Sequence, residues 1–373
     1  MRVLFSTNVP SPYRVDFFNE LGKYCDLTVC FERKSASDRD GKWVGEAAKN
    51  YRAVQLELKL YKEDRSRGNA LRDFVRTNEF DIVIFTNYVS PATMSAISYC
   101  RRHKKKYYIE YDGGFNKKDR FPISLLKKHL LGGAAGHFTT CEEHIKYLLS
   151  IGIPEKKIWK YPFTSVCEAD IRRADEQLSL DRSSLREKLG MSEKRIVLTV
   201  GRFIACKRMD ILLKAASSLG QGVGVYFVGG NPTEEYVKLQ NELKLENVHF
   251  VGFKTKEELA YYYAAADVFA MTTEGDVWGL VINEAMSYGL PVVSTDRCIA
   301  ALEMVKNGEN GYIVPVGDSD ALAEKINAII GDEVLKQSFS RKSAEIARKY
   351  TIEKMAQRHV EIFKEIQERE LED

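Results

Sequence analysis

Short apolar runs alternate with helical patterns along the first half of the chain. Runs typical of buried strands begin at Val3, Leu27, Val54, Ile82 and Tyr107, and near His137 and Ile158. Helical patterns lie between them, at Arg14–Leu21, Ala70–Arg76, Pro91–Cys100, Ile123–Leu131 and Glu142–Ser150. This alternation predicts βαβ units and therefore a parallel sheet. Residues 35–50 are polar without a clear period, and we predict a long loop there.

A second series of the same kind begins at Arg195. It follows a charged stretch poor in large apolar residues, and we interpret residues 166–194 as a linker that ends in a short helix. Strands are predicted at 195–201, 223–228, 248–251, 267–271 and 291–294, and the pattern after Pro315 is helical. A chain of 373 residues is long for one core. We therefore expect an α/β fold with domains at 1–165 and 195–351.

The most informative stretch runs from Thr272 to Met286, between a buried strand and a helix. Ligands of open α/β sheets collect outside the carboxyl ends of strands, and a helix starting near Gly279 directs N–H groups there, which suits a phosphate. The carboxylate of Glu284 can accept hydrogen bonds from two neighbouring ribose hydroxyls, and Asp276 can accept them from a sugar. The alternative is that both acids are ordinary residues of a helix start.

A second motif, Val200–Asp210, also follows a strand. Gly201 allows close approach of the backbone, and Arg202 and Lys207 can converge on one anionic group. Such cations would stabilise the negative charge that grows on a departing nucleotide. The alternative is a solvated basic turn before a helix.

Together these motifs resemble the signature of the retaining glycosyltransferases of family 4. The resemblance rests on Asp276-x7-Glu284 with Trp278–Gly279–Leu280–Val281 inside it, and on the Gly201–Arg202…Lys207 element. It implies two Rossmann-like domains facing each other across a cleft (the GT-B fold), with the last helix, 352–373, packed on the first domain. The family usually has Glu at the first acidic position. Here Asp276 stands there, with Glu274 two residues earlier, so either acid is a candidate for the donor sugar.

The same resemblance assigns roles within the second domain. Arg202 and Lys207 would hold the donor diphosphate together with the helix start at Gly279, Leu280 and Val281, while Glu284 would hold the ribose. Two softer elements would complete the pocket: Gly229 in a turn of small residues, and the turn Gly252–Phe253–Lys254, which in the family reads the nucleotide base through backbone groups.

Candidate chemistry in the first domain is less specific. Arg14, at the first helix, is a candidate for donor phosphate or for the acceptor, with an exposed helix-start arginine as the alternative. Glu110 and Asp112 stand near the position where many relatives carry a histidine. Asp112 is a candidate acceptor-side base, with local capping of a loop as the alternative.

The distribution of charge along the chain bears on the partners that the protein can bind. Residues 1–160 hold 29 Lys and Arg against 19 Asp and Glu, although the whole chain has a net charge of +3. The basic runs 101–106 and 117–131 either rest on anionic lipid or are solvated helix faces. We expect no nucleic-acid partner, because no nucleic-acid motif accompanies the charge.

Other features favour a cytoplasmic enzyme without a metal. The seven cysteines are scattered singly, and no long apolar segment suggests a signal peptide or a membrane span. Two Asp-x-Asp triplets, 38–40 and 318–320, fall in a polar loop and at a predicted helix cap, so we predict no metal and no cofactor.

We therefore predict a retaining, metal-independent glycosyltransferase. It would move a hexose from a UDP- or GDP-sugar to a glycan or lipid-linked acceptor in cell-surface polysaccharide biosynthesis. Two alternatives remain open from the sequence. One is a nucleotide-sugar 2-epimerase of similar fold, and the other is a non-catalytic protein that binds nucleotide-sugars.

Overall fold

The computed structural model describes residues 1–34, 47–56, 69–115 and 121–372. The chain divides into two compact units, one of residues 1–165 with 352–373 and the other of residues 166–351. The predicted loop at 35–50 and the Asp-x-Asp triplet at 38–40 lie largely outside the described residues. The basic residues at 117–120 lie outside them as well.

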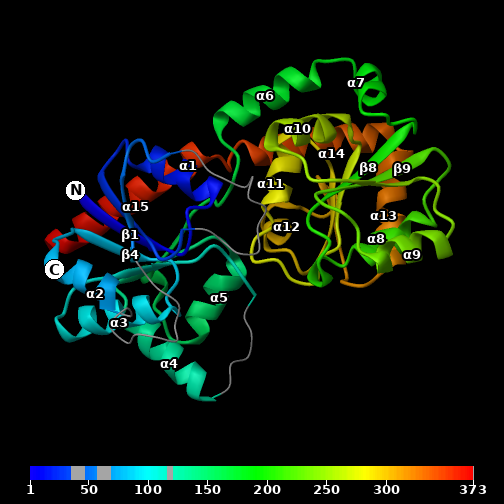
Figure 1. The fold of residues 1–373 in the computed structure, drawn as a ribbon. Helices are drawn as coiled ribbons and strands as arrows, with labels where there is room; N and C mark the ends of the chain where they lie inside the picture. The colour runs from blue at the N-terminus through cyan, green and yellow to red at the C-terminus, as the bar shows by residue number, and fades with distance from the viewer. Residues whose placement is uncertain (35–46, 57–68, 116–120, 373) are drawn as a thin grey trace. The chain divides into compact units, whose positions relative to one another are not determined.

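The first unit contains a seven-stranded parallel sheet in the order β3-β2-β1-β4-β5-β6-β7 (Figure 1). Its strands are β1 Arg2–Thr7, β2 Asp26–Phe31, β3 Arg52–Gln55, β4 Ile82–Phe85, β5 Tyr108–Glu110, β6 Gly136–Thr139 and β7 Ile158–Lys160. Its helices are α1 Pro12–Leu21, α2 Ala70–Thr77, α3 Pro91–Arg102, α4 Phe121–Gly132, α5 Glu142–Ser150 and α15 Ile352–Glu372, with a short 3-10 turn η2 at Glu155–Lys157.

Alternation along β1 directs side chains into two cores. Leu4 belongs to a buried cluster that includes residues of α2, α3 and α4. The next residue, Phe5, points the other way and packs against Phe17 and Phe18 of α1, with ring centroids 6.1 and 5.2 Å away. Helix α15 lies beside α1 (Figure 1). The C-terminal helix is thus part of the first unit, although the chain reaches it only after the second.

The second unit contains a six-stranded parallel sheet in the order β10-β9-β8-β11-β12-β13. Its strands are β8 Arg195–Val200, β9 Val223–Val228, β10 Val248–Val251, β11 Val268–Met271, β12 Val292–Thr295 and β13 Gly311–Val314. Its helices are α6 Glu168–Leu178, α7 Arg182–Lys188, α8 Met209–Ala216, α9 Glu234–Glu242, α10 Lys256–Ala265, α11 Leu280–Ser287, α12 Ile299–Met304, α13 Ser319–Gly331 and α14 Glu333–Ala347, with a 3-10 turn η3 at Ala205–Lys207.

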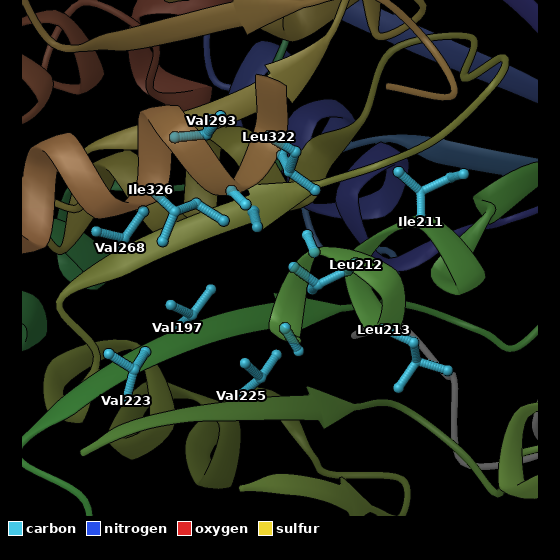
Figure 2. Close-up of a cluster of buried hydrophobic side chains, with 14 of the residues drawn as sticks. Val197, Ile211, Leu212, Leu213, Val223, Val225, Val268, Val293, Leu322 and Ile326 are labelled. Atoms are coloured by element: carbon cyan, nitrogen blue, oxygen red, sulfur yellow. The ribbon is translucent and has the colours of Figure 1, made fainter. Parts of the chain in front are cut away.

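The core of the second unit lies between its sheet and helices α8 and α13. Figure 2 shows aliphatic side chains of β8, β9 and β11 meeting those of the two helices. Val197, Leu212, Val225, Val268 and Ile326 are all fully buried there. Burying such side chains contributes about 1.5–3 kcal/mol each, which fixes the strands whose ends carry the candidate site.

The α/β fold class with two Rossmann-like units is confirmed, and two local predictions need correction. Residues 166–194 are not an extended linker. They hold α6 and α7, and they belong to the second unit, where Arg186 Nη2 donates to the carbonyl of Ala265 at 2.7 Å. Strand β13 was not predicted, because a short edge strand that starts at a glycine gives little periodic signal.

Candidate functional site

The two sequence motifs meet at one point of the second sheet. The chain runs from β8 outward to β9 and β10, and then crosses back to β11 on the other side of β8. The order reverses between β8 and β11, and such a switch point is where open α/β sheets bind ligands. The 201–208 turn follows β8 and the 272–279 loop follows β11, so both motifs stand at this point.

Hydrogen bonds join the two loops directly. Thr273 Oγ1 and the Glu274 amide both donate to the carbonyl of Cys206, each at 2.9 Å. Thr272 Oγ1 donates to the carbonyl of Lys207 at 3.0 Å. These bonds fix the backbone on either side of Lys207, so the position of its side chain depends on both motifs.

Two cations of the turn, Lys207 and Arg208, each face an acid of the loop. Lys207 Nζ forms an ion pair with Asp276 Oδ2, and both side chains are about one-fifth exposed. Arg208 Nη1 lies 3.5 Å from Glu274 Oε2 and also grips Asp210 through two hydrogen bonds of 3.0 Å. Asp276 therefore lies against Lys207, whereas Glu274 lies against a second cation that sequence reasoning did not single out.

Glycines let the strand ends approach each other. Gly201 N donates to the carbonyl of Val228 at 2.9 Å, next to Gly229. Gly229 has a φ of +131°, and a Cβ there would lie 2.6 Å from the carbonyl oxygen of Gly201. Only glycine fits such a position, so the predicted role of Gly229 in leaving space has a steric basis.

Helix α11 starts at this point of the sheet. Gly279 precedes it with a φ of +103°, and a Cβ there would lie 2.5 Å from Cys298 Sγ. Leu280, Val281 and Glu284 are partly exposed, while Trp278 is buried and donates from Nε1 to Asn283 Oδ1 at 2.7 Å. The first N–H groups of a helix carry positive partial charge. The start of α11 therefore adds to the positive potential of the nearby cations.

Glu284 is held by a residue that the motifs did not reveal. The hydroxyl of Tyr263, a buried residue of α10, donates to Glu284 Oε2 at 2.9 Å. Burial, reinforced by the charge of Glu284, raises the pKa of Tyr263 well above its ordinary value. The tyrosine therefore stays a donor at any physiological pH. Its sequence signal is weak, because three consecutive tyrosines on a helix do not show which one reaches the acid.

The remaining predicted residues of the second unit lie further along the same edge. Arg202 directly follows Gly201 and is partly exposed. Gly252, Phe253 and Lys254 follow β10, which is separated from β8 by β9. Phe253 is 40% exposed, and Lys254 Nζ lies 3.7 Å from Glu258. The site residues of this unit thus share one edge of the sheet, with the 252–254 turn at its far side.

In the first unit, Arg14 does not lie where the prediction put it. It is only 2% exposed, with one guanidinium nitrogen on Glu110 and another on Asp112. Both arms are engaged inside the unit, which argues against Arg14 as a ligand of donor phosphate and against an exposed helix-start arginine. Burial, opposed by Arg14 and assisted by the Glu110 charge, raises the pKa of Asp112.

The described part of the chain shows neither a metal-binding cluster nor a membrane-spanning helix. Among the described residues, no three His, Cys, Asp or Glu side chains come together in a way that suits a metal ion. Asp318 of the second triplet caps α13, accepting from the amide of Ala321 at 2.9 Å. No described helix combines the length and apolar character that crossing a bilayer requires.

Comparison with known proteins agrees with this geometry. The family described as "Glycosyl transferases group 1" matches residues 181–350, which include both loops of the switch point. Residues 181–350 belong to that family. The resemblance to glycosyltransferases is therefore confirmed, and the chain is a glycosyltransferase of two Rossmann-like domains.

Individual relatives of this glycosyltransferase are distant. An "Uncharacterized glycosyltransferase" of Haemophilus influenzae is 25% identical over 84% of each chain. The "Lipopolysaccharide core biosynthesis glycosyltransferase LpsE" of Rhizobium meliloti is 32% identical, but the match spans only 40% of this chain and 44% of that protein. The solved structure of Anabaena Alr3699/HepE in complex with UDP has a TM-score of 0.77 at 18% identity, covering 98% of this chain and all of that one, which shows a shared fold.

Proposed function

We propose that the chain is a retaining, metal-independent hexosyltransferase that uses a UDP- or GDP-sugar. The observation that carries the proposal is the convergence of Lys207, Asp276 and the start of α11 at the switch point. A diphosphate placed there would meet a lysine, the partly exposed Arg202 and the positive end of a helix. These are the groups that stabilise charge on a departing nucleoside diphosphate.

Donor binding would rearrange the Lys207–Asp276 pair. In the ligand-free protein the two side chains neutralise each other. A diphosphate competes with Asp276 for Lys207, and the carboxylate it displaces becomes available to the sugar hydroxyls. Glu284, oriented by Tyr263, would bind the ribose. Glu274, half exposed beside Arg208, is the second candidate for the sugar.

Under this proposal, retention of the anomeric configuration needs no covalent nucleophile. The acceptor hydroxyl would attack from the face that the diphosphate leaves, and the cations would hold the departing group in place. The family resemblance and the relatives that act on lipopolysaccharide and capsule support a glycan or lipid-linked acceptor in cell-surface polysaccharide biosynthesis.

The test is a panel of UDP- and GDP-sugars incubated with and without lipid-linked acceptors after treatment with EDTA. We expect transfer with one donor class, slow donor hydrolysis without acceptor, and a product whose anomeric configuration by NMR equals that of the donor. An inverted product, or activity that only an added metal restores, would contradict the mechanism. Epimerisation of the donor, or binding without turnover, would instead support the alternatives.

A second proposal concerns the surface of the first unit that would contact a membrane carrying the acceptor. Helix α4 buries Leu130 and Leu131, yet it exposes apolar side chains on its other face, with Phe121 77% and Leu125 52% exposed. Exposed apolar side chains that gather on one helix mark a surface that meets a partner or a membrane. Arg101 Nη1 donates to the carbonyl of His129 at 2.9 Å, which places the exposed basic turn 102–105 beside the end of α4. We propose that this surface rests on an anionic bilayer.

Vesicle sedimentation tests the membrane proposal. The full chain should bind vesicles that contain phosphatidylglycerol more strongly than vesicles of phosphatidylcholine alone, and Leu125→Glu should weaken that binding. Val334→Glu is the matched control, since Val334 is an exposed apolar residue of the other unit. Equal binding by the two variants would contradict the proposal.

A further inference from the structure

A chain of four ionisable side chains crosses the first unit from its last helix to the end of β5. His359 of α15 contacts Glu110, Glu110 contacts Arg14, and Arg14 contacts Asp112. The first three are at most 2% exposed, whereas the Asp112 side chain is 31% exposed. The chain therefore starts in the core and ends at a partly exposed side chain.

Both ring nitrogens of His359, the first member, have close oxygen contacts. The His359 Nδ1 atom lies 2.8 Å from the carbonyl oxygen of Met355, and Nε2 lies 3.0 Å from Glu110 Oε2. Arg14 on the other oxygen keeps Glu110 ionised. Although burial raises the pKa of that carboxyl, Arg14 and His359 outweigh it and lower the pKa. Both ring nitrogens thus face oxygen atoms, an arrangement that a ring with two N–H groups satisfies.

With such a ring, charges alternate along the resulting chain, from imidazolium to carboxylate to guanidinium to carboxylate. Each buried charge is compensated by its neighbour, which buried ions require. Aromatic rings surround the imidazole ring, with the centroids of Tyr161 and Phe17 at 4.6 and 4.8 Å. Each member of the chain contacts the next, so moving one of them would disturb its neighbour.

The end of the chain stands at the carboxyl edge of the sheet. Asp112 follows β5, and Gly113 and Gly114 come next with φ values of +120° and +113°. A Cβ on Gly114 would meet nothing within 4 Å among the described residues, so the space beside this part of the loop is open. Only an arginine has two parallel arms that can hold Glu110 and Asp112 at once.

We propose that His359, Glu110 and Arg14 are positioning residues that hold Asp112 for the acceptor hydroxyl. This inference rests on the proposed function, sugar transfer to an acceptor hydroxyl, and it adds that the first unit orients that hydroxyl. Asp112 accepts the hydrogen bond of the attacking hydroxyl and orients it, while His359 links that orientation to the seating of the C-terminal helix. The donor site of the second unit contains none of these residues.

Steady-state kinetics of Arg14→Lys and His359→Gln test the proposal. Lysine keeps the charge but loses the second arm, and glutamine keeps one donor but loses the charge. We expect transfer to the acceptor to fall by about 10²-fold in kcat/KM, as for a misplaced reacting group. Dissociation constants for UDP or GDP and the rate of donor hydrolysis should stay at the wild-type values.

The control is Glu365→Gln on the same helix. It weakens the contact from Trp159 Nε1 to Glu365 Oε2, 2.7 Å in length, which also ties α15 to the sheet but does not reach Asp112. If this control loses transfer as much as His359→Gln, the effect comes from the helix and the relay is overturned. Asp112→Asn with undiminished transfer would also overturn it.

A measurement without substrate separates this inference from the proposed function. In ¹⁵N NMR of the full chain near neutral pH, both ring nitrogens of His359 should be protonated, and Glu110→Gln should abolish that signature. A singly protonated ring would overturn the relay even in an active enzyme. A wild type that transfers no sugar would overturn the proposed function and the role of Asp112, while the ring signals would still show whether the relay exists.

Discussion

Replacing Lys207 with methionine separates a binding role from a structural one. Methionine keeps most of the volume and removes the charge. Lys207 and Asp276 are each about one-fifth exposed, and the pair stands at the edge of the sheet where water screens it. Such a pair contributes about 0–1 kcal/mol to stability. We therefore expect the free energy of unfolding to change by no more than that amount.

The effect on ligand binding should be larger. A hydrogen bond to a charged group contributes about 1.5–3 kcal/mol. Loss of the Lys207 contact with a diphosphate then weakens binding about 10- to 150-fold. Two effects act on this loss of affinity in opposite directions. It is reduced because the wild-type lysine must give up Asp276 before it binds phosphate. It is increased because Asp276, without its cation in the variant, stays near the site and repels the phosphate.

Isothermal titration with UDP and GDP, together with urea denaturation, measures both quantities. Lys214→Met is the matched control. Lys214 lies on α8, is about half exposed, and pairs with Asp210 at 3.6 Å away from the 272–279 loop. The control should bind nucleotide as the wild type does. If Lys207→Met bound nucleotide normally, or lost stability in proportion to affinity, the assignment of Lys207 to the diphosphate would be wrong.

Three further predictions concern the scaffold of the site. Gly229→Ala should destabilise the second unit by more than the ~1–2 kcal/mol of a left-handed residue, because the new Cβ would also meet the Gly201 carbonyl at 2.6 Å; unchanged urea denaturation would refute this. Tyr263→Phe removes the donor to Glu284 and should weaken nucleoside diphosphate binding by about 0.5–1.5 kcal/mol, measured by titration, and an unchanged affinity would show that Glu284 does not depend on it. Asp267, buried directly before β11, forms ion pairs with Arg186 at 2.7 Å and with Lys336 at 2.9 Å. Asp267→Asn should lower the free energy of unfolding by about 3–5 kcal/mol at neutral pH, measured by urea denaturation. Although burial raises the pKa of Asp267, its cationic partners outweigh burial and lower the pKa below the unfolded value. The stabilisation by Asp267 is therefore lost as pH falls below about 4. Between neutral pH and that range, the free energy of unfolding of the variant should depend less on pH than that of the wild type.

Most helices and strands could be predicted from the local pattern of apolar and polar residues. Strand β8 and the turn after it are contiguous in sequence, as are β11, its loop and α11, so each half of the candidate site was visible as a strand, a turn and a helix. The βαβ alternation then placed both halves at carboxyl edges of a parallel sheet. What the pattern did not show was that β8 and β11 are neighbours, which is what brings Lys207 to Asp276.

The missed residues share a physical cause. Tyr263 reaches Glu284 from another helix, and His359 reaches Glu110 across 249 residues of chain. Tertiary packing alone brings these partners together, and neither leaves a periodic trace in the sequence. Neither the ligand role nor the exposed alternative considered for Arg14 pointed to a buried residue, because an arginine is rarely buried without partners and its two carboxylates lie on and just after a distant strand. The sequence pattern thus predicts elements well and long-range ion pairs poorly.

The most direct test is a crystal structure of the full chain with UDP or GDP bound. The account predicts a diphosphate within hydrogen-bonding distance of Lys207 and of the first amides of α11, with Asp276 released from Lys207 and the ribose on Glu284. A nucleotide bound elsewhere, with the Lys207–Asp276 pair intact, would contradict it.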